Sequence, residues 1–152
     1  MDNVNLEYTI DKATKEELLE FFKISDEFFD PPLHSFVELE AYAVKIRTFA
    51  TTFEVWDNGK LIGYSAVYLN DVNKKDAYGL NLSVLPEYRK KHDIFKTLRK
   101  IGIDRVIQDG FERFIFEVQK KAPALIEYYS KNGFEVLGDK NEDYVIMGLN
   151  LK

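Results

Sequence analysis

Two strand-like segments separated by one helical segment constrain the fold of this chain more than any other feature. Residues 77–85 and 113–118 have the apolar pattern of strands, and residues 94–108 between them have helical periodicity. The buried stripe expected for this helix contains Phe95, Leu98, Ile101, Gly102 and Val106. Gly110 follows where a helix C-cap is expected. Two strands joined through a helix are expected to run parallel. The sequence therefore predicts a parallel pair inside a mixed sheet.

The N-terminal part predicts a strand at residues 6–10 and then two amphipathic helices. Thr14 with Glu17, and Ser35 with Glu38, have the spacing of capping boxes. We expect the first helix to stop at Asp30-Pro31-Pro32. The apolar residues at helical spacing are Leu18, Phe21, Phe22, Ser25 and Phe28/Phe29 in the first helix, and Phe36, Leu39, Ala43 and Ile46 in the second.

The remaining segments complete the element order. Asn58-Gly59 between residues 53–56 and 61–69 predicts a β-hairpin. Pro123 opens a short helix that Gly133 ends, with Phe134 placed to close the cap, and strands follow at 134–137 and 144–151. The predicted order is β-α-α-β-β-β-α-β-α-β-β, an α/β (α+β) class. No linker or repeat divides residues 1–152, so we expect one domain.

Composition excludes several classes of function. The chain has 21 basic and 26 acidic residues, a net charge of −5, which argues against a nucleic-acid or anionic-membrane partner. It has no cysteine, and its two histidines lack carboxylates at metal-ligand spacing, so we expect no metal. No apolar run reaches membrane-spanning length and no leader is visible at the N-terminus, so we expect a cytoplasmic protein.

The segment from residue 82 to residue 98 is the most informative about function. A strand ends at Pro86, the basic residues Arg89, Lys90 and Lys91 follow, and a helix begins within a few residues. Side-chain charge, backbone N–H groups and the helix dipole would then converge on one point, which suits a phosphate. From spacing alone, a solvated basic loop explains the same residues equally well.

Several motifs resemble those of the GNAT N-acetyltransferase superfamily. Val84-x-Pro86-Glu87-Tyr88-Arg89 is similar to the start of its acyl-CoA motif, and Tyr129-x-x-x-Gly133-Phe134 is similar to its late Y-x-x-x-G-F motif. Gly110-Phe111 before residues 114–118 resembles its helix-to-strand step, and residues 59–63 resemble its hairpin. The resemblance covers roughly residues 50–151. It implies a single-domain GNAT-like fold, a twisted sheet flanked by helices, with a V-shaped opening between strands 77–85 and 113–118.

The resemblance also implies a site and a mechanism. Acetyl-CoA would be the co-substrate, and an acceptor amine would attack its thioester directly. By the same resemblance, Tyr129 protonates the leaving thiolate. A general base is not obvious; Glu117 is one candidate and a water relay is the other. The residues expected to bind the co-substrate are Leu82, Ser83 and Val84 at the thioester, and Arg89, Lys90, Lys91, His92, Asp93, Ile94 and Phe95 at the diphosphate.

The diphosphate loop departs from the family pattern. The family has two small residues here, and read without a gap they become His92 and Ile94. With a one-residue insertion, which we prefer because it keeps the helix in register, they become Asp93 and Phe95. Glycine lets backbone N–H groups approach a diphosphate closely, and a carboxylate at residue 93 that faced the ligand would repel it. We therefore expect a degenerate loop.

Two functions follow from the resemblance. The first is an N-acetyltransferase acting on a primary amine of a small molecule, in a monomer or homodimer. The alternative is a GNAT-fold protein with weak or lost catalysis that acts as a binding or regulatory module. Acidic residues around the first two helices suit a cationic acceptor, although surface helices are commonly acidic; they include Asp26, Glu27, Asp30 and Glu38.

Overall fold

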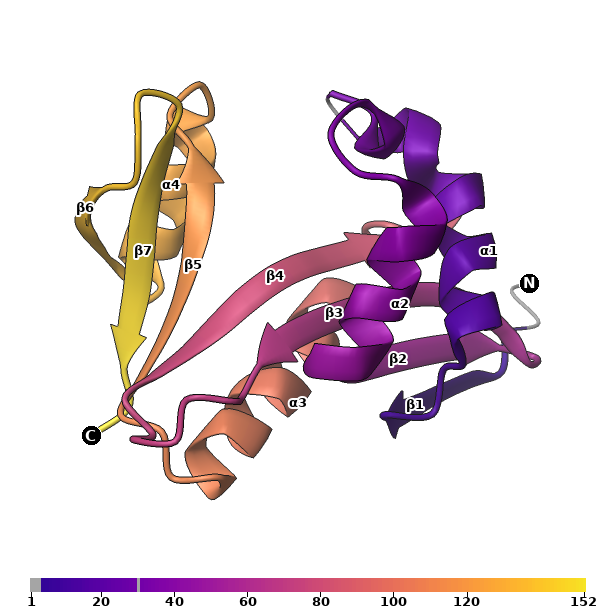
Figure 1. The fold of residues 1–152 in the computed structure, drawn as a ribbon, viewed down its shortest axis with the longest axis horizontal. Helices are drawn as coiled ribbons and strands as arrows, with labels where there is room; N and C mark the ends of the chain where they lie inside the picture. The colour runs from indigo at the N-terminus through magenta and orange to yellow at the C-terminus, as the bar shows by residue number, and fades with distance from the viewer. Residues whose placement is uncertain (1–3, 30) are drawn as a thin grey trace. The chain divides into compact units, whose positions relative to one another are not determined.

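The computed structural model describes residues 4–29 and 31–152, and within them the elements follow the predicted order (Figure 1). The strands are β1 (Leu6–Ile10), β2 (Thr51–Asp57), β3 (Lys60–Tyr68), β4 (Asp76–Val84), β5 (Arg113–Gln119), β6 (Glu135–Asp139) and β7 (Tyr144–Asn150). The helices are α1 (Lys15–Ser25), α2 (Leu39–Phe49), α3 (Ile94–Gln108) and α4 (Pro123–Lys131). Three short 3-10 turns lie at η1 (Asp26–Phe28), η2 (Leu33–Ser35) and η3 (Pro86–Tyr88).

The described strands form a mixed sheet in the order β1-β2-β3-β4-β5-β7-β6. The β4–β5 pair is parallel, as predicted, whereas β1–β2, β2–β3, β5–β7 and β6–β7 are antiparallel. The parallel ladder joins Asp76–Tyr78 to Arg113–Ile115. Leu82–Val84 lie beyond the last residue pair of that ladder. The V-shaped opening expected beyond it stays a prediction.

The chain divides into two compact units. The first contains the chain up to Val67 together with Asn81–Gly102, and the second contains Tyr68–Leu80 and Ile103–Lys152. The boundary passes through strand β4 and helix α3, each of which contributes residues to both units. The single domain expected over residues 1–152 stays a prediction.

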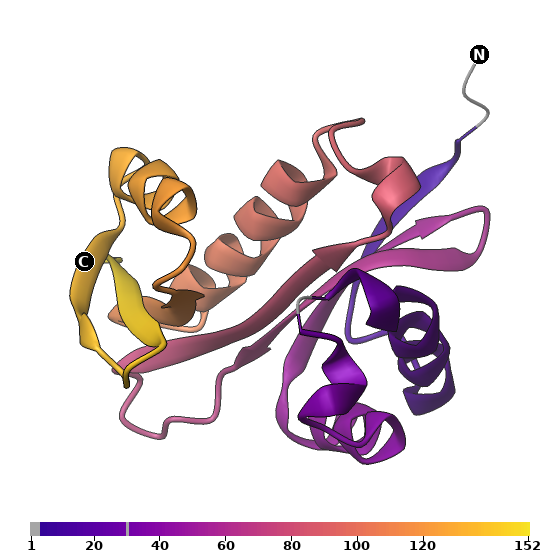
Figure 2. The same cartoon turned by 90° about the horizontal axis from the view of Figure 1, so that it is seen from above.

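In the first unit, helices cover both faces of the strands (Figure 2). Tyr64 of β3 packs edge-on against Phe21 and Phe22 of α1, with ring centroids 5.6 and 5.4 Å apart. On the opposite face, Phe53 of β2 lies 3.8 Å from the place where Gly102 of α3 would carry a Cβ. The capping box of α1 is confirmed, since Thr14 and Glu17 bond each other's backbone N–H groups. The Asn58-Gly59 turn is also confirmed, because Asp57 pairs with Lys60 across it.

A buried carboxylate connects the elements of the first unit. Glu54 of β2 is fully buried and accepts hydrogen bonds from the Thr9 hydroxyl (2.6 Å), the Lys12 N–H (3.1 Å) and the Thr52 hydroxyl. Arg47 of α2 donates to the Thr52 hydroxyl at 2.9 Å and pairs with Asp11 at 2.7 Å. The network therefore joins β1, the segment before α1, α2 and β2. Each hydrogen bond gives a partner to a polar group whose burial without one would cost free energy of folding.

In the second unit, α4 packs on one face of β5 and β7 (Figure 1). The core cluster contains Val118, Phe134, Val145 and Met147, with Ile126 and Tyr129 of α4 packed against it. Gly79 of β4 is required by packing, because a Cβ there would lie 2.7 Å from Cζ of Phe114. The parallel pair is therefore closely packed at its start.

The same cap ends α3 and α4. Gly110 and Gly133 both adopt a positive φ, of 88° and 93°. The N–H of the following residue then bonds a carbonyl five residues back, Phe111 to Val106 and Phe134 to Tyr129. This is the Schellman geometry, and Phe134 adds the usual apolar contact by packing on Tyr129. Both predicted caps are confirmed.

The connection between α1 and α2 differs from the prediction. The first helix ends at Ser25 and continues only as the turn η1, and Asp30 of the expected stop lies outside the described residues. Ser35 is not the cap of α2, because its hydroxyl donates to the Pro32 carbonyl. Glu38 is the N-cap instead and accepts from the Ala41 N–H at 2.6 Å. Phe36, expected on the buried face, precedes the helix and is 61% exposed.

We predict that Glu54→Leu destabilises the protein by roughly 2–4 kcal/mol, because it leaves one buried hydroxyl and two part-buried donors without their acceptor. Urea unfolding measures the change in free energy of unfolding. Glu7→Leu is the matched control, since Glu7 is exposed on the neighbouring strand. Equal losses in both variants would show that the buried hydrogen bonds contribute little.

Candidate active site

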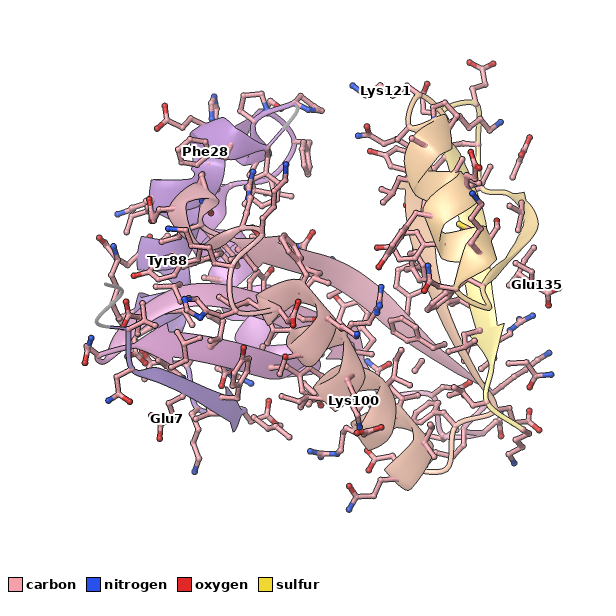
Figure 3. The ribbon with its side chains drawn as sticks, turned by 180° about the vertical axis from the view of Figure 1, so that it is seen from behind. Glu7, Phe28, Tyr88, Lys100, Lys121 and Glu135 are labelled. Carbon is pink, nitrogen blue, oxygen red and sulfur yellow. The ribbon has the colours of Figure 1, made fainter. Side chains whose placement is uncertain are left out.

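The segment between β4 and α3 carries the expected cofactor-binding residues, all in the first unit. Ser83 and Val84 are buried and Leu82 is half-buried. Beyond them, the Leu85 N–H donates to the Ile62 carbonyl at 2.9 Å and the turn η3 begins at Pro86. Figure 3 labels Tyr88 in this segment. Proline ends the strand here because it has no N–H to continue a ladder.

Two side chains anchor the segment. The Nε of Arg89 donates to the Val84 carbonyl at 2.8 Å, so this predicted phosphate ligand also holds the end of β4. The Tyr88 hydroxyl donates to Asp57 at 2.5 Å. Asp57 lies at the end of β2 and also accepts from the Asn5 N–H and the Asn58 side chain. No local sequence pattern points to Asp57, because it lies 31 positions away from Tyr88.

The loop before α3 adopts left-handed backbone at residues that are not glycine. Lys90, His92 and Asp93 have φ values of 65°, 57° and 51°. Such a conformation costs non-glycine residues of the order of 1 kcal/mol each, less for Asp and His than for Lys. With or without the one-residue insertion, the first small residue of the family pattern aligns with a residue that has left-handed backbone here. The backbone has the shape that glycine favours, built from other residues.

The start of α3 corrects one expectation. Phe95, expected in the buried stripe of the helix, is 39% exposed, whereas Ile94 is 2% exposed. Ile94, Leu98, Gly102 and Val106 form the buried face, at a spacing of four residues. Lys90 and Lys91 are exposed directly before the helix. The first N–H groups of a helix have no intrahelical partner, so this end of α3 and the two lysines fit a diphosphate.

Hydrogen bonding shifts the pKa values of the anchoring pair. The hydrogen bond to Asp57 raises the pKa of Tyr88 to about 12. The same bond, with the Asn5 N–H, lowers the pKa of Asp57. Asp93 acts on Tyr8 of β1, whose pKa is raised mainly by burial and further by the Asp93 charge. The Asp93 carboxylate is therefore close enough to affect β1 as well as the loop.

Tyr129, the expected general acid, lies in the second unit. Its ring packs against Phe116 of β5 and Phe134, with centroids 4.8 and 5.4 Å away. The cap at Gly133 fixes its place two residues before the end of the helix at Lys131. Tyr128, its neighbour, is 47% exposed. The two residues are about 100° apart around the helix, and their rings still meet edge-on with centroids 5.5 Å apart.

Glu117, one candidate for the general base, lies on β5 in the second unit. Its carboxylate accepts from Nζ of Lys140 at 2.5 Å, and Lys120 pairs with Asp139 at 2.9 Å. Both ion pairs connect β5 to the β6–β7 turn and its flanking residues. Glu117 thus makes a structural contact, and its role as a general base stays a prediction.

A groove lies along α1 and the residues leading into α2. It has a volume of about 700 Å³ and is lined by Leu19, Lys23 and residues 34–40. Near it, Asp26 accepts from the backbone N–H and Nδ1 of His34 at 2.7 and 2.6 Å. Desolvation raises the pKa of Asp26, but the hydrogen bonds and charge of His34 with the Leu33 N–H bring it below its ordinary value. Asp26 and Glu38 are thus already engaged in local contacts.

Two further observations bear on the class of the protein. No group of three or more His, Asp or Glu side chains in residues 4–29 and 31–152 could hold a metal ion. None of the helices in that same part of the chain is long and apolar enough to cross a membrane.

The chain belongs to the Acetyltransferase (GNAT) family, whose sequence pattern it matches over residues 12–134. This is a family of N-acetyltransferase enzymes, as the sequence motifs predicted. No curated protein matches the chain by sequence.

Solved structures share the fold at low sequence identity. The chain is similar to the PaiA N-acetyltransferase from Thermoplasma acidophilum in complex with coenzyme A, with 19% identity, TM-score 0.69 and coverage of 95% and 99% of the two chains. It is similar to the ribosomal-protein-S18-alanine N-acetyltransferase from Escherichia coli, with 19% identity, TM-score 0.71 and coverage of 96% and 95%. A spermidine N-acetyltransferase chimera from Vibrio cholerae and hSSAT has 15% identity, TM-score 0.74 and coverage of 95% of both chains. The predicted GNAT fold is confirmed.

We predict that Tyr88→Phe raises the pKa of Asp57 toward its ordinary value, because the variant removes the phenol that donates to it. Carboxyl-carbon NMR measures the titration. The lowered pKa of Asp57 contributes stability that is present above about pH 4 and lost as pH falls through the lowered value. The raised pKa of Tyr88 contributes stability that is present below about pH 10 and lost as pH rises toward 12. An unchanged Asp57 titration would contradict the assignment.

Proposed function

We propose that this protein transfers an acetyl group directly from acetyl-CoA to a primary amine of a small molecule. Family membership supports the reaction class, and one local observation supports acetyl-CoA as the donor. That observation is the segment 82–95, in which a strand end, a left-handed loop, two exposed lysines and a helix N-terminus follow one another. Backbone N–H groups and lysine charges of this kind recognise a diphosphate.

In this proposal, acetyl-CoA supplies an activated thioester. Backbone groups of Leu82 to Val84 hold the pantetheine arm and polarise the thioester carbonyl. Lys90, Lys91 and the N–H groups at the start of α3 bind the diphosphate. Arg89 holds Val84 through its carbonyl and so fixes the shape of the strand end.

The chemistry is one acyl transfer. The amine nitrogen forms a bond to the carbonyl carbon, and the carbon–sulfur bond breaks as the carbonyl re-forms. The sulfur leaves with the electron pair and takes the proton of the Tyr129 hydroxyl, while the amine loses one proton to a base or to water. A phenol suits this step because it is neutral near pH 7 and can donate to a forming thiolate.

The base is either Glu117 or a chain of water molecules. Glu117 already accepts a hydrogen bond from Lys140, so one of its carboxylate oxygens is engaged in a contact inside the second unit. This contact favours the water relay. Glu117 is then a residue that holds the β6–β7 connection to β5.

The proposed acceptor is small and cationic. The groove beside α1 has the volume typical of small-molecule sites, and Glu38 and Glu40 lie along it. Lys23 lines the same groove, so its charge is mixed. The acceptors named for similar structures are spermidine and an alanine of ribosomal protein S18, which makes a mixed panel the appropriate assay.

A second candidate function is a binding or regulatory module with weak catalysis. The observation that favours it is the loop, where side chains stand at the positions that glycine occupies in the family pattern and Asp93 adds a negative charge. Both features would lower affinity for a diphosphate. Binding of CoA therefore discriminates the two proposals most directly.

We predict that replacing Lys90 and Lys91 by Glu weakens CoA binding by roughly 1–3 kcal/mol, the scale of charge-assisted hydrogen bonds. Isothermal titration calorimetry measures the Kd. The control replaces Lys23 and Lys45 by Glu, which changes net charge equally on α1 and α2. Unchanged affinity in the first variant would move the diphosphate elsewhere. If the unchanged protein does not bind millimolar CoA, the module proposal replaces the enzyme proposal.

We predict that Tyr129→Phe lowers acetyl transfer by a factor of the order of 10² or more, while CoA binding and stability change little. The variant keeps the ring contacts with Phe116 and Phe134 and removes only the hydroxyl. Single-turnover release of CoA from acetyl-CoA is measured with polyamines, amino acids and an alanine-terminated peptide. Tyr128→Phe is the matched control and should be near neutral. Equal rates for Tyr129→Phe and the unchanged protein would leave Tyr129 as a packing residue.

A further inference from the structure

The loop before α3 holds a conformation that its residues do not favour by themselves. Lys90, His92 and Asp93 are all left-handed within four positions, and none is glycine. Left alone, such residues would return to ordinary backbone regions, at a gain of the order of 1 kcal/mol each. Strain of this kind persists only where surrounding contacts fix the backbone. Contacts at the ends of the loop must therefore hold the left-handed backbone that glycine residues would adopt without strain.

The Tyr88–Asp57 hydrogen bond is the long-range contact at the entrance to this loop. It joins the last residue of η3 to the last residue of β2 at 2.5 Å. A bond to an ionised carboxylate is short and about twice as strong as a neutral one. The raised pKa of Tyr88 and the lowered pKa of Asp57 agree with a neutral phenol donating to a carboxylate.

Asp57 is itself held in place. Its carboxylate accepts from the Asn5 N–H at 3.1 Å and from the Asn58 side chain at 2.9 Å. Its backbone pairs with Lys60 across a two-residue turn in which Asn58 and Gly59 both have positive φ. The turn type fixes the register of a hairpin, so the carboxylate has a defined position. It is a rigid anchor for a loop that is strained.

We propose that Asp57 and Tyr88 are positioning residues for the diphosphate of CoA, and that their hydrogen bond holds the left-handed loop in which glycines are missing. Neither residue is assigned a contact with the ligand. Without the bond, the loop populates the binding-competent shape less often, and the apparent Kd rises in proportion. The inference rests on the proposed binding of acetyl-CoA at residues 82–95.

The first experiment measures the Kd of CoA by calorimetry on the full chain. Tyr88→Phe and Asp57→Ala should each weaken binding about 5- to 20-fold, and the double variant should be no weaker than either. Asp57→Asn keeps an acceptor oxygen and should lose less than Asp57→Ala. Tyr144→Phe, which removes a phenol hydroxyl in the second unit, should leave the Kd unchanged. Equal Kd values for Tyr88→Phe and the unchanged protein would overturn the proposal.

The second experiment separates positioning from a general loss of stability. His92→Gly relieves left-handed strain at one of the three positions and leaves Tyr88 and Asp57 unchanged. In the His92→Gly background, Tyr88→Phe should weaken CoA binding by less than about 3-fold relative to His92→Gly alone, which is the rescue that the strain argument requires. The Tm is recorded for each variant. A general structural defect would lower the Tm, and the substitution at residue 92 would not reverse it. Absence of rescue would overturn the strain argument.

The two proposals fail in different ways. If the unchanged protein does not bind CoA, the proposed acetyl-CoA site is wrong and this inference falls with it. If the unchanged protein binds CoA and Tyr88→Phe binds it equally, the site stands and only the role of Asp57 and Tyr88 is wrong.

Discussion

The parallel pairing of β4 with β5 is the constraint on which the rest of the structure depends. Parallel neighbours cannot be joined by a tight turn, so the chain must leave β4, form α3 and return. That path creates a strand end, a loop and a helix N-terminus in succession. It is also the segment that carries the candidate diphosphate site. The Phe114 ring over Gly79 shows how closely the pair packs where it begins.

The loop before α3 adopts a left-handed backbone without the residue that adopts it most easily. Glycine adopts left-handed backbone at no steric cost, whereas Lys90, His92 and Asp93 do so at a cost. Side-chain contacts offset that cost. Arg89 holds the strand end through the Val84 carbonyl, and Tyr88 holds the loop entrance through Asp57. A contact between distant residues thus replaces a local conformational preference.

In the second unit, the side chain of Tyr129 is positioned by a local device instead of a long-range contact. Tyr129 is placed by a helix cap, in which Gly133 turns the chain and Phe134 both closes the cap and packs on the Tyr129 ring. Every part of this device lies within six residues. Local sequence is therefore enough to predict the geometry of this cap. The surrounding cluster of Phe116, Val118 and Met147 stabilises it.

Local preferences in the sequence determined the element order, the α1 capping box, the Asn58-Gly59 turn and the two glycine caps, because each depends on residues a few positions apart. They also placed the basic loop before α3. The α2 cap was missed because the spacing of Ser35 and Glu38 fits a capping box, whereas the Ser35 hydroxyl donates to the Pro32 carbonyl and Glu38 itself caps the helix. Likewise, Ile94 and Phe95 are adjacent apolar residues, and only the core decided which is buried. Tertiary structure alone decided the Tyr88–Asp57 and Glu117–Lys140 contacts. They join residues far apart in the chain, and no helix or strand periodicity predicts a contact of that kind.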